Sequence, residues 1–443
     1  MKNKKLTLLA LTWPIFVEML LFMLMGNVDV FMLSRYSDDA VVAVGVANQF
    51  IQMAITIFGF VSVGSAVIIA QYLGAEKYNE AKKVSGTSLY CNFAFGLVLS
   101  FIFIFGRNLI LNIMPDLYPE VRDYASTVLL LVGGCIFLQG LLTGTNAILR
   151  SYGHTRDTLV TTASMNVLNI IGNFIVLFGP FGLPVFGVTG VAVVTVISRA
   201  VALSIGLYLL HRRVRRPFRE ISLLAFPFHY AKQILRIGIP AAGENLSYIG
   251  YQTFLTTIVA GMGSAALATR IYGRALNVFM FVLTISLAQG GQILIGHLMG
   301  AKEYEAIYKK CFTILRYGIC SSVFMAITFF IFAEPLLGIF TSDPEVIDAG
   351  RRVLFVFIFL EIGRACNMVI IGALRAVGDV KFPVYVGVCT MWGLGALGGF
   401  LLGSVFGLGV VGIVMGTALD ECVRGVIMFF RWKSRVWQTK GVG

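Results

Sequence analysis

The chain has 443 residues, of which 58% are hydrophobic and 13% charged, with a mean hydropathy of +0.85. A soluble domain is usually about 45–50% apolar and about 25% charged, so this composition excludes an ordinary water-soluble fold and requires lipid around much of the surface. The net charge of +13 does not indicate nucleic-acid binding, because Lys and Arg stand between apolar stretches rather than on one folded surface.

Apolar stretches long enough to cross about 30 Å of bilayer hydrocarbon recur along the chain, and no strand-like alternation competes with them. A backbone in lipid must satisfy its own hydrogen bonds, which favours helices. We predict about twelve transmembrane helices. Their approximate limits are 10–33, 44–73, 84–106, 124–149, 159–179 and 188–210 in the first half, and 237–261, 271–299, 312–333, 353–374, 382–405 and 409–430 in the second.

Basic residues in the short connections between these stretches predict the orientation of the chain. With the N-terminus inside, the inner connections hold about 24 Lys and Arg residues and the outer ones about 6. This asymmetry predicts a multi-pass protein of the inner or plasma membrane with both termini in the cytoplasm. We interpret the most basic connection, 211–236, as a cytoplasmic linker rather than a patch for lipid headgroups.

The residues after this linker repeat those before it. Pro14 and Tyr78 recur as Pro240 and Tyr304, both at an offset of 226 positions. A repeat at a fixed offset indicates a duplicated unit, and such duplication is typical of transporters that move one half against the other. We therefore predict an all-α polytopic membrane protein of two six-helix lobes related by pseudo-twofold symmetry along the membrane normal. The N-terminal six-helix lobe is predicted at 1–210, the basic cytoplasmic linker at 211–236 and the C-terminal six-helix lobe at 237–443.

Asp29 is the sharpest functional candidate, because an ionisable side chain within a membrane span is costly unless it has a role. Asn166, Asn169 and Asn173 share one helical face, and Thr195 lies in the following span. A carboxylate with amide and hydroxyl oxygens suits a small hard cation or a proton. The alternative is hydrogen bonding between helices, which Asn and Thr commonly provide. With Asp29 present, we predict a coupling-ion site, with Na⁺ possible at Asp29, Asn169 and Asn173.

Two further polar groups lie within spans of the second half. Glu244 precedes Tyr248 by one helical turn, and a carboxylate beside aromatic rings suits a lipophilic organic cation. Glu361, Arg364 and Asn367 recur every three residues on one face, where Glu361 and Arg364 can pair directly. This second group is open to two interpretations, a neutralised structural pair and a substrate contact. We predict all five residues as candidates for substrate binding.

No catalytic motif accompanies these residues. The sequence contains no Walker loop, no H-E-x-x-H and no G-x-S-x-G motif, and its four histidines are scattered. We therefore predict no enzyme activity and no cofactor beyond a coupling ion, Na⁺ or H⁺. We expect a monomer in the lipid bilayer that carries a small, cationic organic substrate and binds no nucleic acid.

Several segments, in order and duplicated, resemble the multidrug and toxic compound extrusion (MATE) family over essentially the whole chain. They are Gly26–Arg35, Gln71–Ala75, Leu149–Gly153, Asn169–Asn173, Gly187–Gly190, Leu360–Asn367 and Leu374–Asp379. The resemblance implies two six-helix lobes that alternate between outward- and inward-facing states. It also implies export of cationic, often aromatic compounds in exchange for Na⁺ or H⁺, with a cation site at Asp29, Asn169, Asn173 and Thr195.

The second half departs from the family's pattern. Where many members carry an acidic residue two turns after the proline of this helix, the chain has Tyr248, and its own acid, Glu244, comes one turn earlier. A related alternative is a flippase for a lipid-linked precursor of similar fold, which would favour a wide cationic cavity. A membrane enzyme would instead need a paired acid and base near one membrane surface, and the sequence shows none.

Overall fold

The computed structural model describes residues 6–114, 117–214 and 227–441. Within these residues most segments are helical and no strand occurs, which confirms the predicted all-α fold. The chain divides into two compact units. We call Trp13–Leu73 with Lys77–Gly238 the N-terminal lobe, and Ile239–Gly443, together with Gly74–Glu76 and the residues up to Thr12, the C-terminal lobe.

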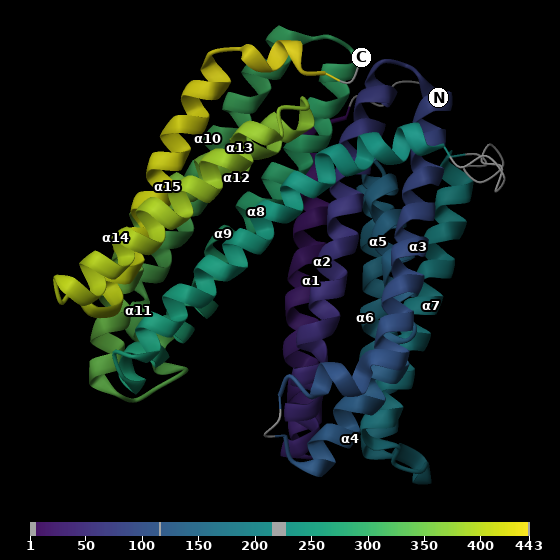
Figure 1. Cartoon of the computed structure of the whole chain (residues 1–443), viewed down its shortest axis with the longest axis vertical. Helices are drawn as coiled ribbons and strands as arrows, with labels where there is room; N and C mark the ends of the chain where they lie inside the picture. Colours follow the sequence, from purple (N-terminus) through teal and green to yellow (C-terminus); the bar gives the residue numbers. More distant parts are fainter. Residues whose placement is uncertain (1–5, 115–116, 215–226, 442–443) are drawn as a thin grey trace. The chain divides into compact units, whose positions relative to one another are not determined.

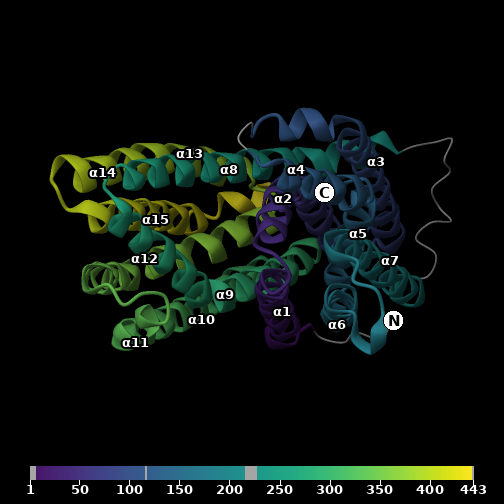
Figure 2. The ribbon, with the colours of Figure 1, turned by 90° about the horizontal axis from the view of Figure 1, so that it is seen from below.

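The long helices of the N-terminal lobe run lengthwise beside one another (Figures 1 and 2). They are α1 (Leu8–Ser34), α2 (Asp38–Gly74), α3 (Tyr78–Leu111), α5 (Ile136–Ser151), α6 (Thr155–Phe178) and α7 (Gly187–Val214). A shorter helix, α4 (Pro119–Val128), continues through a π-helical turn at Leu129–Gly133. The pair formed by Pro119–Gly133 and Ile136–Ser151 bends by 47°, so it reads as one broken span.

The C-terminal lobe repeats this series of long helices. They are α8 (Phe228–Ala260), α9 (Ser264–Gly300), α10 (Tyr304–Ile331), α12 (Pro344–Ala376) and α15 (Gly409–Lys433), with a short α11 (Ala333–Gly338) between α10 and α12. Between α12 and α15, a π-helical segment at Met391–Ala396 joins α13 (Lys381–Thr390) to α14 (Leu397–Phe400), and a second at Leu401–Val405 continues the stretch. Gly416 of α15 packs directly on Gly399, because a Cβ atom at Gly416 would lie 2.3 Å from the backbone nitrogen of Gly399.

Nine helices in the described part of the chain are long and apolar enough to cross a membrane, and the bent α4–α5 pair makes a tenth. Helices α8 and α15, with 33 and 25 residues, also exceed the roughly 20 residues that a span needs. They carry ionisable residues within the span, among them Glu244 and Asp420. With these two, the helices account for the twelve spans predicted from the sequence.

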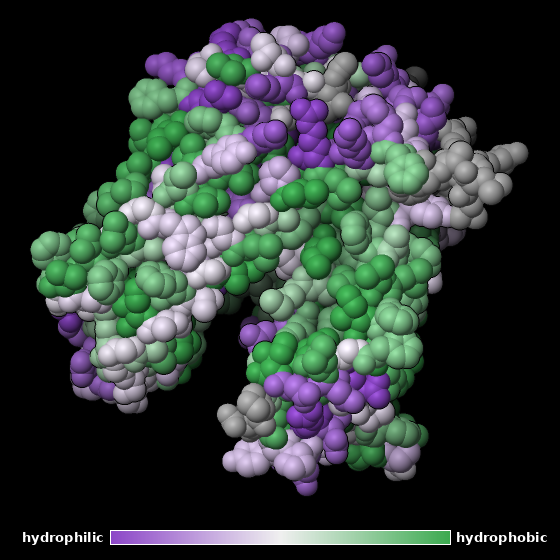
Figure 3. Space-filling model, viewed as in Figure 1, coloured by the Kyte–Doolittle hydropathy of each residue, from purple (hydrophilic) through white to green (hydrophobic). Residues whose placement is uncertain are grey.

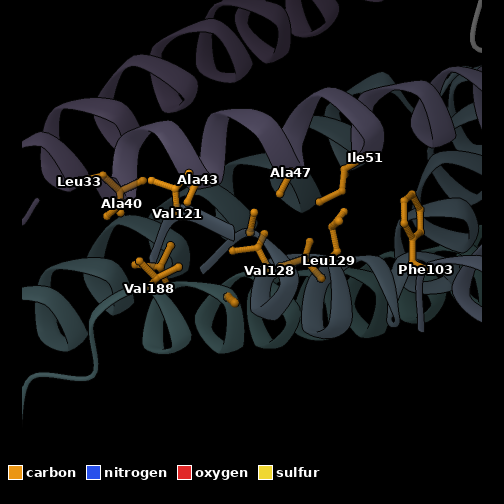
Figure 4. Packing of buried hydrophobic residues seen from close by; sticks show 14 of the residues in the cluster. Leu33, Ala40, Ala43, Ala47, Ile51, Phe103, Val121, Val128, Leu129 and Val188 are labelled. Carbon is orange, nitrogen blue, oxygen red and sulfur yellow. The ribbon is translucent and has the colours of Figure 1, made fainter. Parts of the chain in front are cut away.

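The interior of the N-terminal lobe is a continuous apolar cluster. Ala40, Ala43 and Ala47 lie on successive turns of α2 and pack with Val128 and Val188 (Figure 4). Small side chains allow membrane helices to approach closely. On the face shown in Figure 3, hydrophobic residues line the helices of each lobe and hydrophilic residues gather toward the helix ends. This distribution is the one that membrane-spanning helices require.

The helices extend beyond the limits that hydropathy predicts. Helix α7 ends at Val214 and α8 begins at Phe228, so both ends of the predicted linker 211–236 are helical. Residues 215–226 of that linker lie outside the described residues. The physical reason is that hydropathy marks the edge of the lipid, whereas a helix ends where its backbone hydrogen bonding ends.

Candidate functional site

Asp29 lies half-buried in the last third of α1, beside α6. The side-chain amide of Asn173 donates one hydrogen bond to Oδ1 of Asp29 at 3.0 Å and another to Oδ1 of Asn169 at 2.9 Å. Asn169 donates in turn to Oγ1 of Thr195 on α7 at 3.3 Å. Asn169 and Asn173 are four residues apart and share one face of α6. The structure therefore brings all four predicted coupling-ion residues into one chain of contacts.

The site also contains a buried oxygen that is free to bind. Within the described residues, Oδ1 of Asn173 is buried and accepts no hydrogen bond. Carboxylate, amide and hydroxyl oxygens are the ligands that hard cations prefer. A flip of the Asn173 side-chain amide exchanges the positions of its NH₂ group and its oxygen, so Asn173 can present either one to Asp29. The residues present therefore fit a bound Na⁺ as well as a proton on Asp29.

Among the described residues, no basic side chain forms an ion pair with Asp29. Asp29 takes no part in the ion pairs formed by the described residues of this lobe, which join Lys83 to Glu80, Arg150 to Glu18 and Arg213 to Asp157. Arg35, the basic residue that follows on the chain, lies over the ring of Phe31 with its guanidinium 5.3 Å from the ring centroid. A carboxylate within a span therefore has only a bound ion or proton to compensate it.

The predicted substrate residues of the C-terminal lobe are, by contrast, paired with arginine. Nη2 of Arg375, at the end of α12, lies 2.5 Å from Oε2 of Glu244 on α8. Glu361 and Arg364 pair within α12 at 2.8 Å, and Glu361 is fully buried. Glu361 also accepts a hydrogen bond from Asn277 on α9 at 2.9 Å. The negative charges of these two glutamates are thus compensated inside the lobe.

This network continues onto α15. Asn367 donates to Oε2 of Glu421 at 2.6 Å, and Nε of Arg364 lies 3.6 Å from Oε1 of the same carboxylate. Arg424 contacts both Asp420, at 2.9 Å, and Glu421, at 3.2 Å. Our sequence reasoning did not include Glu421 among the candidates. It occupies the centre of the network because Asn367 and both arginines converge on its carboxylate.

An equivalent of the Glu244–Arg375 pair occurs in the N-terminal lobe and was not predicted. Nη2 of Arg150 lies 2.6 Å from Oε1 of Glu18, and two threonine hydroxyls of α6 donate to the same carboxylate. Glu18 and Glu244 are 226 positions apart, and Arg150 and Arg375 are 225 apart. The repeat could have predicted this pair, because an acid and a base that both recur at the repeat offset indicate the same contact in each half.

Tyr248 is the predicted substrate residue that borders open space. It lines a cavity of about 430 Å³ between α8 and α9. This volume falls in the range of roughly 300–1,000 Å³ typical of small-molecule sites. The other residues that line the cavity are Ile249, Gln252, Thr253, Thr256, Thr257, Ala260, Leu267 and Arg274. Glu244, Glu361, Arg364 and Asn367 are not among them.

Comparison with known proteins places the chain among transporters. The model of the MatE family matches it twice, over residues 14–175 and 240–401. The two matches begin 226 positions apart, which confirms the repeat predicted from Pro14 and Pro240.

Relatives match over nearly the whole length. The uncharacterized transporter YisQ of Bacillus subtilis is 40% identical over 440 residues, which cover 99% of this chain and 96% of YisQ. The probable multidrug resistance protein NorM of Thermotoga maritima is 27% identical over 439 residues, covering 98% of this chain and 93% of NorM.

Solved structures show the same fold. The MATE transporter VcmN of Vibrio cholerae, in its bent form, has a TM-score of 0.87 at 20% identity, covering 96% of this chain and 95% of VcmN. A MOP superfamily transporter from Pyrococcus furiosus has a TM-score of 0.86 at 18% identity, covering 97% of this chain and 95% of that one.

Proposed function

The chain belongs to the MatE family, and on that premise we propose that this multi-pass membrane transporter is a secondary-active antiporter. It exports small, amphipathic organic compounds in exchange for Na⁺ or H⁺ by alternating access. Members of the family are transporters and not enzymes, and the relative from Thermotoga maritima is named as a probable multidrug resistance protein. The duplicated halves support alternating access, since repeats of this kind rock against one another around a site between them.

The observation that carries the proposal is the uncompensated carboxylate of Asp29. Asn169, Asn173 and Thr195 are neutral, so they can solvate a bound cation but cannot neutralise Asp29. A state without an ion or proton is therefore costly, and that cost links ion binding to the equilibrium between the two access states. We propose Asp29, Asn169, Asn173 and Thr195 as the coupling-ion site.

On the substrate side, we propose that Tyr248 contacts the transported compound from the cavity wall. Glu244, Glu361, Arg364 and Asn367 hold α8, α12 and α15 in place through their ion pairs and hydrogen bonds. The expectation of a cationic substrate relied on the charge of Glu244 and on the resemblance to the MATE family. Arg375 supplies the compensating charge within the lobe, so the cation preference loses its main support.

The orientation follows from the basic connections. We propose that both termini and the linker lie in the cytoplasm and that the protein resides in the plasma membrane, because Lys and Arg concentrate in the inner connections. Reaction of the linker with a membrane-impermeant reagent applied to intact cells would contradict this orientation.

The decisive test replaces Asp29 by asparagine, which keeps the shape of the side chain and removes its charge. Everted vesicles that contain the Asp29→Asn protein are loaded with a fluorescent amphipathic dye under an imposed Na⁺ or H⁺ gradient, each tested separately. We expect gradient-driven dye transport to be abolished, with the protein folded and present at the normal level.

The matched control is Asp39→Asn, which removes an exposed carboxylate at the start of α2 and should transport at the wild-type rate. If Asp29→Asn transports at the wild-type rate under either gradient, the coupling site lies elsewhere. The buried Asp420, whose Oδ1 accepts no hydrogen bond within the described residues, then becomes the candidate.

A further inference from the structure

The cavity between α8 and α9 has a polar wall that lipid would disfavour. Gln252, Thr253, Thr256 and Thr257 line it and share one face of α8, since they are spaced by one and four residues. Amide and hydroxyl groups within a span normally face a water-filled path or another helix. Tyr248, Ile249 and Leu267 complete the lining with apolar surface. The cavity can therefore take a ligand with one polar and one apolar part.

Two arginines on α9 set the charge of this wall. Arg270 and Arg274 are four residues apart and so share one face of the helix. Arg274 is exposed and lines the cavity, about 15 Å along the helix from its start at Ser264. Arg270 is buried, and its guanidinium donates to Oε1 of Gln252 at 3.0 Å and to Oγ1 of Thr256 at 3.2 Å. It thereby orders the polar wall from behind.

Neither arginine has a carboxylate partner among the residues that the structure describes. The buried acids of this lobe are already engaged: Glu244 with Arg375, Glu361 with Arg364, and both Asp420 and Glu421 with Arg424. The ionised groups at the cavity wall therefore carry a surplus of positive charge. A cationic ligand would be repelled by Arg274, whereas an anionic ligand would supply the missing partner.

We propose that this cavity binds the exported substrate by an anionic group, and that the substrate is an amphipathic organic carboxylate. The planar guanidinium of Arg274 binds the carboxylate through two parallel hydrogen bonds. The apolar part of the substrate packs on Tyr248, Ile249 and Leu267. This inference rests on the proposed function as an exporter and names the class of compound exported. A phospholipid headgroup offers the same anionic chemistry, and the test separates the two sources.

The test measures equilibrium binding to the full-length protein in nanodiscs of phosphatidylcholine. The probes are 1-naphthoate, the neutral 1-naphthamide and the cation (1-naphthyl)trimethylammonium, which share one ring system. We expect naphthoate to bind most tightly and Arg274→Gln to weaken its binding by about tenfold, with naphthamide binding changed by less than about twofold. Arg274→Lys should restore part of the affinity, because it retains the charge without the second donor.

The matched control is Arg352→Gln, an exposed arginine of the same lobe that pairs only with Asp348 one turn away, and it should leave naphthoate binding unchanged. Equal loss of naphthoate and naphthamide binding in Arg274→Gln, or tighter binding of the cation than of naphthoate, would overturn the proposal. A second set of nanodiscs contains phosphatidylglycerol. Unchanged naphthoate affinity there supports a soluble substrate, and displacement of naphthoate assigns the site to a lipid headgroup instead.

This binding assay requires no ion gradient, so it is independent of coupling. Asp29→Asn should bind naphthoate normally although it transports nothing. Failure of naphthoate to bind would remove the substrate class and leave the antiport proposal standing. Normal naphthoate binding together with full transport by Asp29→Asn would remove the proposed coupling site and leave the substrate class standing.

Discussion

The proposed ion site of the N-terminal lobe has a counterpart region in the C-terminal lobe, and buried apolar side chains occupy that region. At the offset of 226 that relates Glu18 to Glu244, Asp29 corresponds to Leu255. At the offset of 222 that relates Thr195 to Thr417, Asn169 and Asn173 correspond to Met391 and Gly395. Leu255 and Met391 are buried members of an apolar cluster. No carboxylate or amide remains at these positions.

In this counterpart region, the ring of Tyr251 occupies the space beside Gly395. Its ring is fully buried, its hydroxyl donates to Oγ1 of Thr417 at 3.0 Å, and a Cβ atom at Gly395 would lie 2.6 Å from its oxygen. The absence of a side chain at Gly395 therefore makes room for the ring. The two lobes thus share a helical framework, but the C-terminal lobe has apolar packing where the N-terminal lobe has the proposed ion site.

The frameworks themselves have kept their ion pairs. Glu18–Arg150 recurs as Glu244–Arg375, and each lobe also holds a further acid–arginine pair, Asp157 with Arg213 at 2.8 Å and Asp379 with Arg431 at 2.9 Å, although these two pairs do not lie at one repeat offset. We propose that contacts present in both lobes hold the helices of each lobe together, whereas contacts present in only one lobe serve ion coupling or substrate binding. The following three predictions test this division.

The largest expected effect on stability comes from breaking a shared pair. Glu18→Gln and Glu244→Gln should each lower the free energy of unfolding by about 1–3 kcal/mol, because a partly buried arginine loses its charged acceptor. Both should lower the melting temperature in detergent by similar amounts. Glu334→Gln, which breaks an exposed pair with Arg351, should cost less than about 1 kcal/mol. A large effect in one lobe and none in the other would refute the structural equivalence.

A smaller effect on stability is expected at Gly395, in the C-terminal counterpart of the proposed ion site. Gly395→Ala places a methyl group against the ring of Tyr251, and overpacking of this kind costs about 1–3 kcal/mol when neighbours cannot move freely. Gly393→Ala is the matched control, since a Cβ atom there meets nothing within 4 Å. The ion dependence of transport should stay unchanged in both variants. A shift in ion dependence with Gly395→Ala would show that the second lobe still takes part in coupling.

The smallest effect on stability, but a specific one on coupling, is expected for Asn173→Ala. It removes one hydrogen bond to Asp29, worth about 1 kcal/mol, so the ion concentration for half-maximal transport should rise by roughly fivefold while transport persists. Asn166→Ala serves as control, because Asn166 donates to the backbone carbonyl of Leu21 instead of to Asp29. Equal ion dependence in the two variants would count against Asn173 as a ligand.

The sequence alone determined the membrane class, the helices and the repeat, and it singled out the residues that the structure brings together around Asp29. Each rests on a local or periodic signal: apolar length for the spans, a constant offset for the repeat, and the four-residue spacing of Asn169 and Asn173 for their common face. Asp29 could be added because a lone carboxylate in an apolar stretch is conspicuous without any knowledge of its neighbours.

Only the tertiary structure decided which charges are neutralised. Glu244 and Asp29 look alike in the sequence, as single acids within apolar stretches. In the structure, Glu244 pairs with Arg375, a residue 131 positions away, whereas Asp29 accepts a hydrogen bond from the side-chain amide of Asn173. Helical periodicity assigns a residue to a face but does not say which distant helix packs on that face. The charge at a site is the sum over all helices that meet there, so the positive wall beside Arg274 could not be read from any one segment.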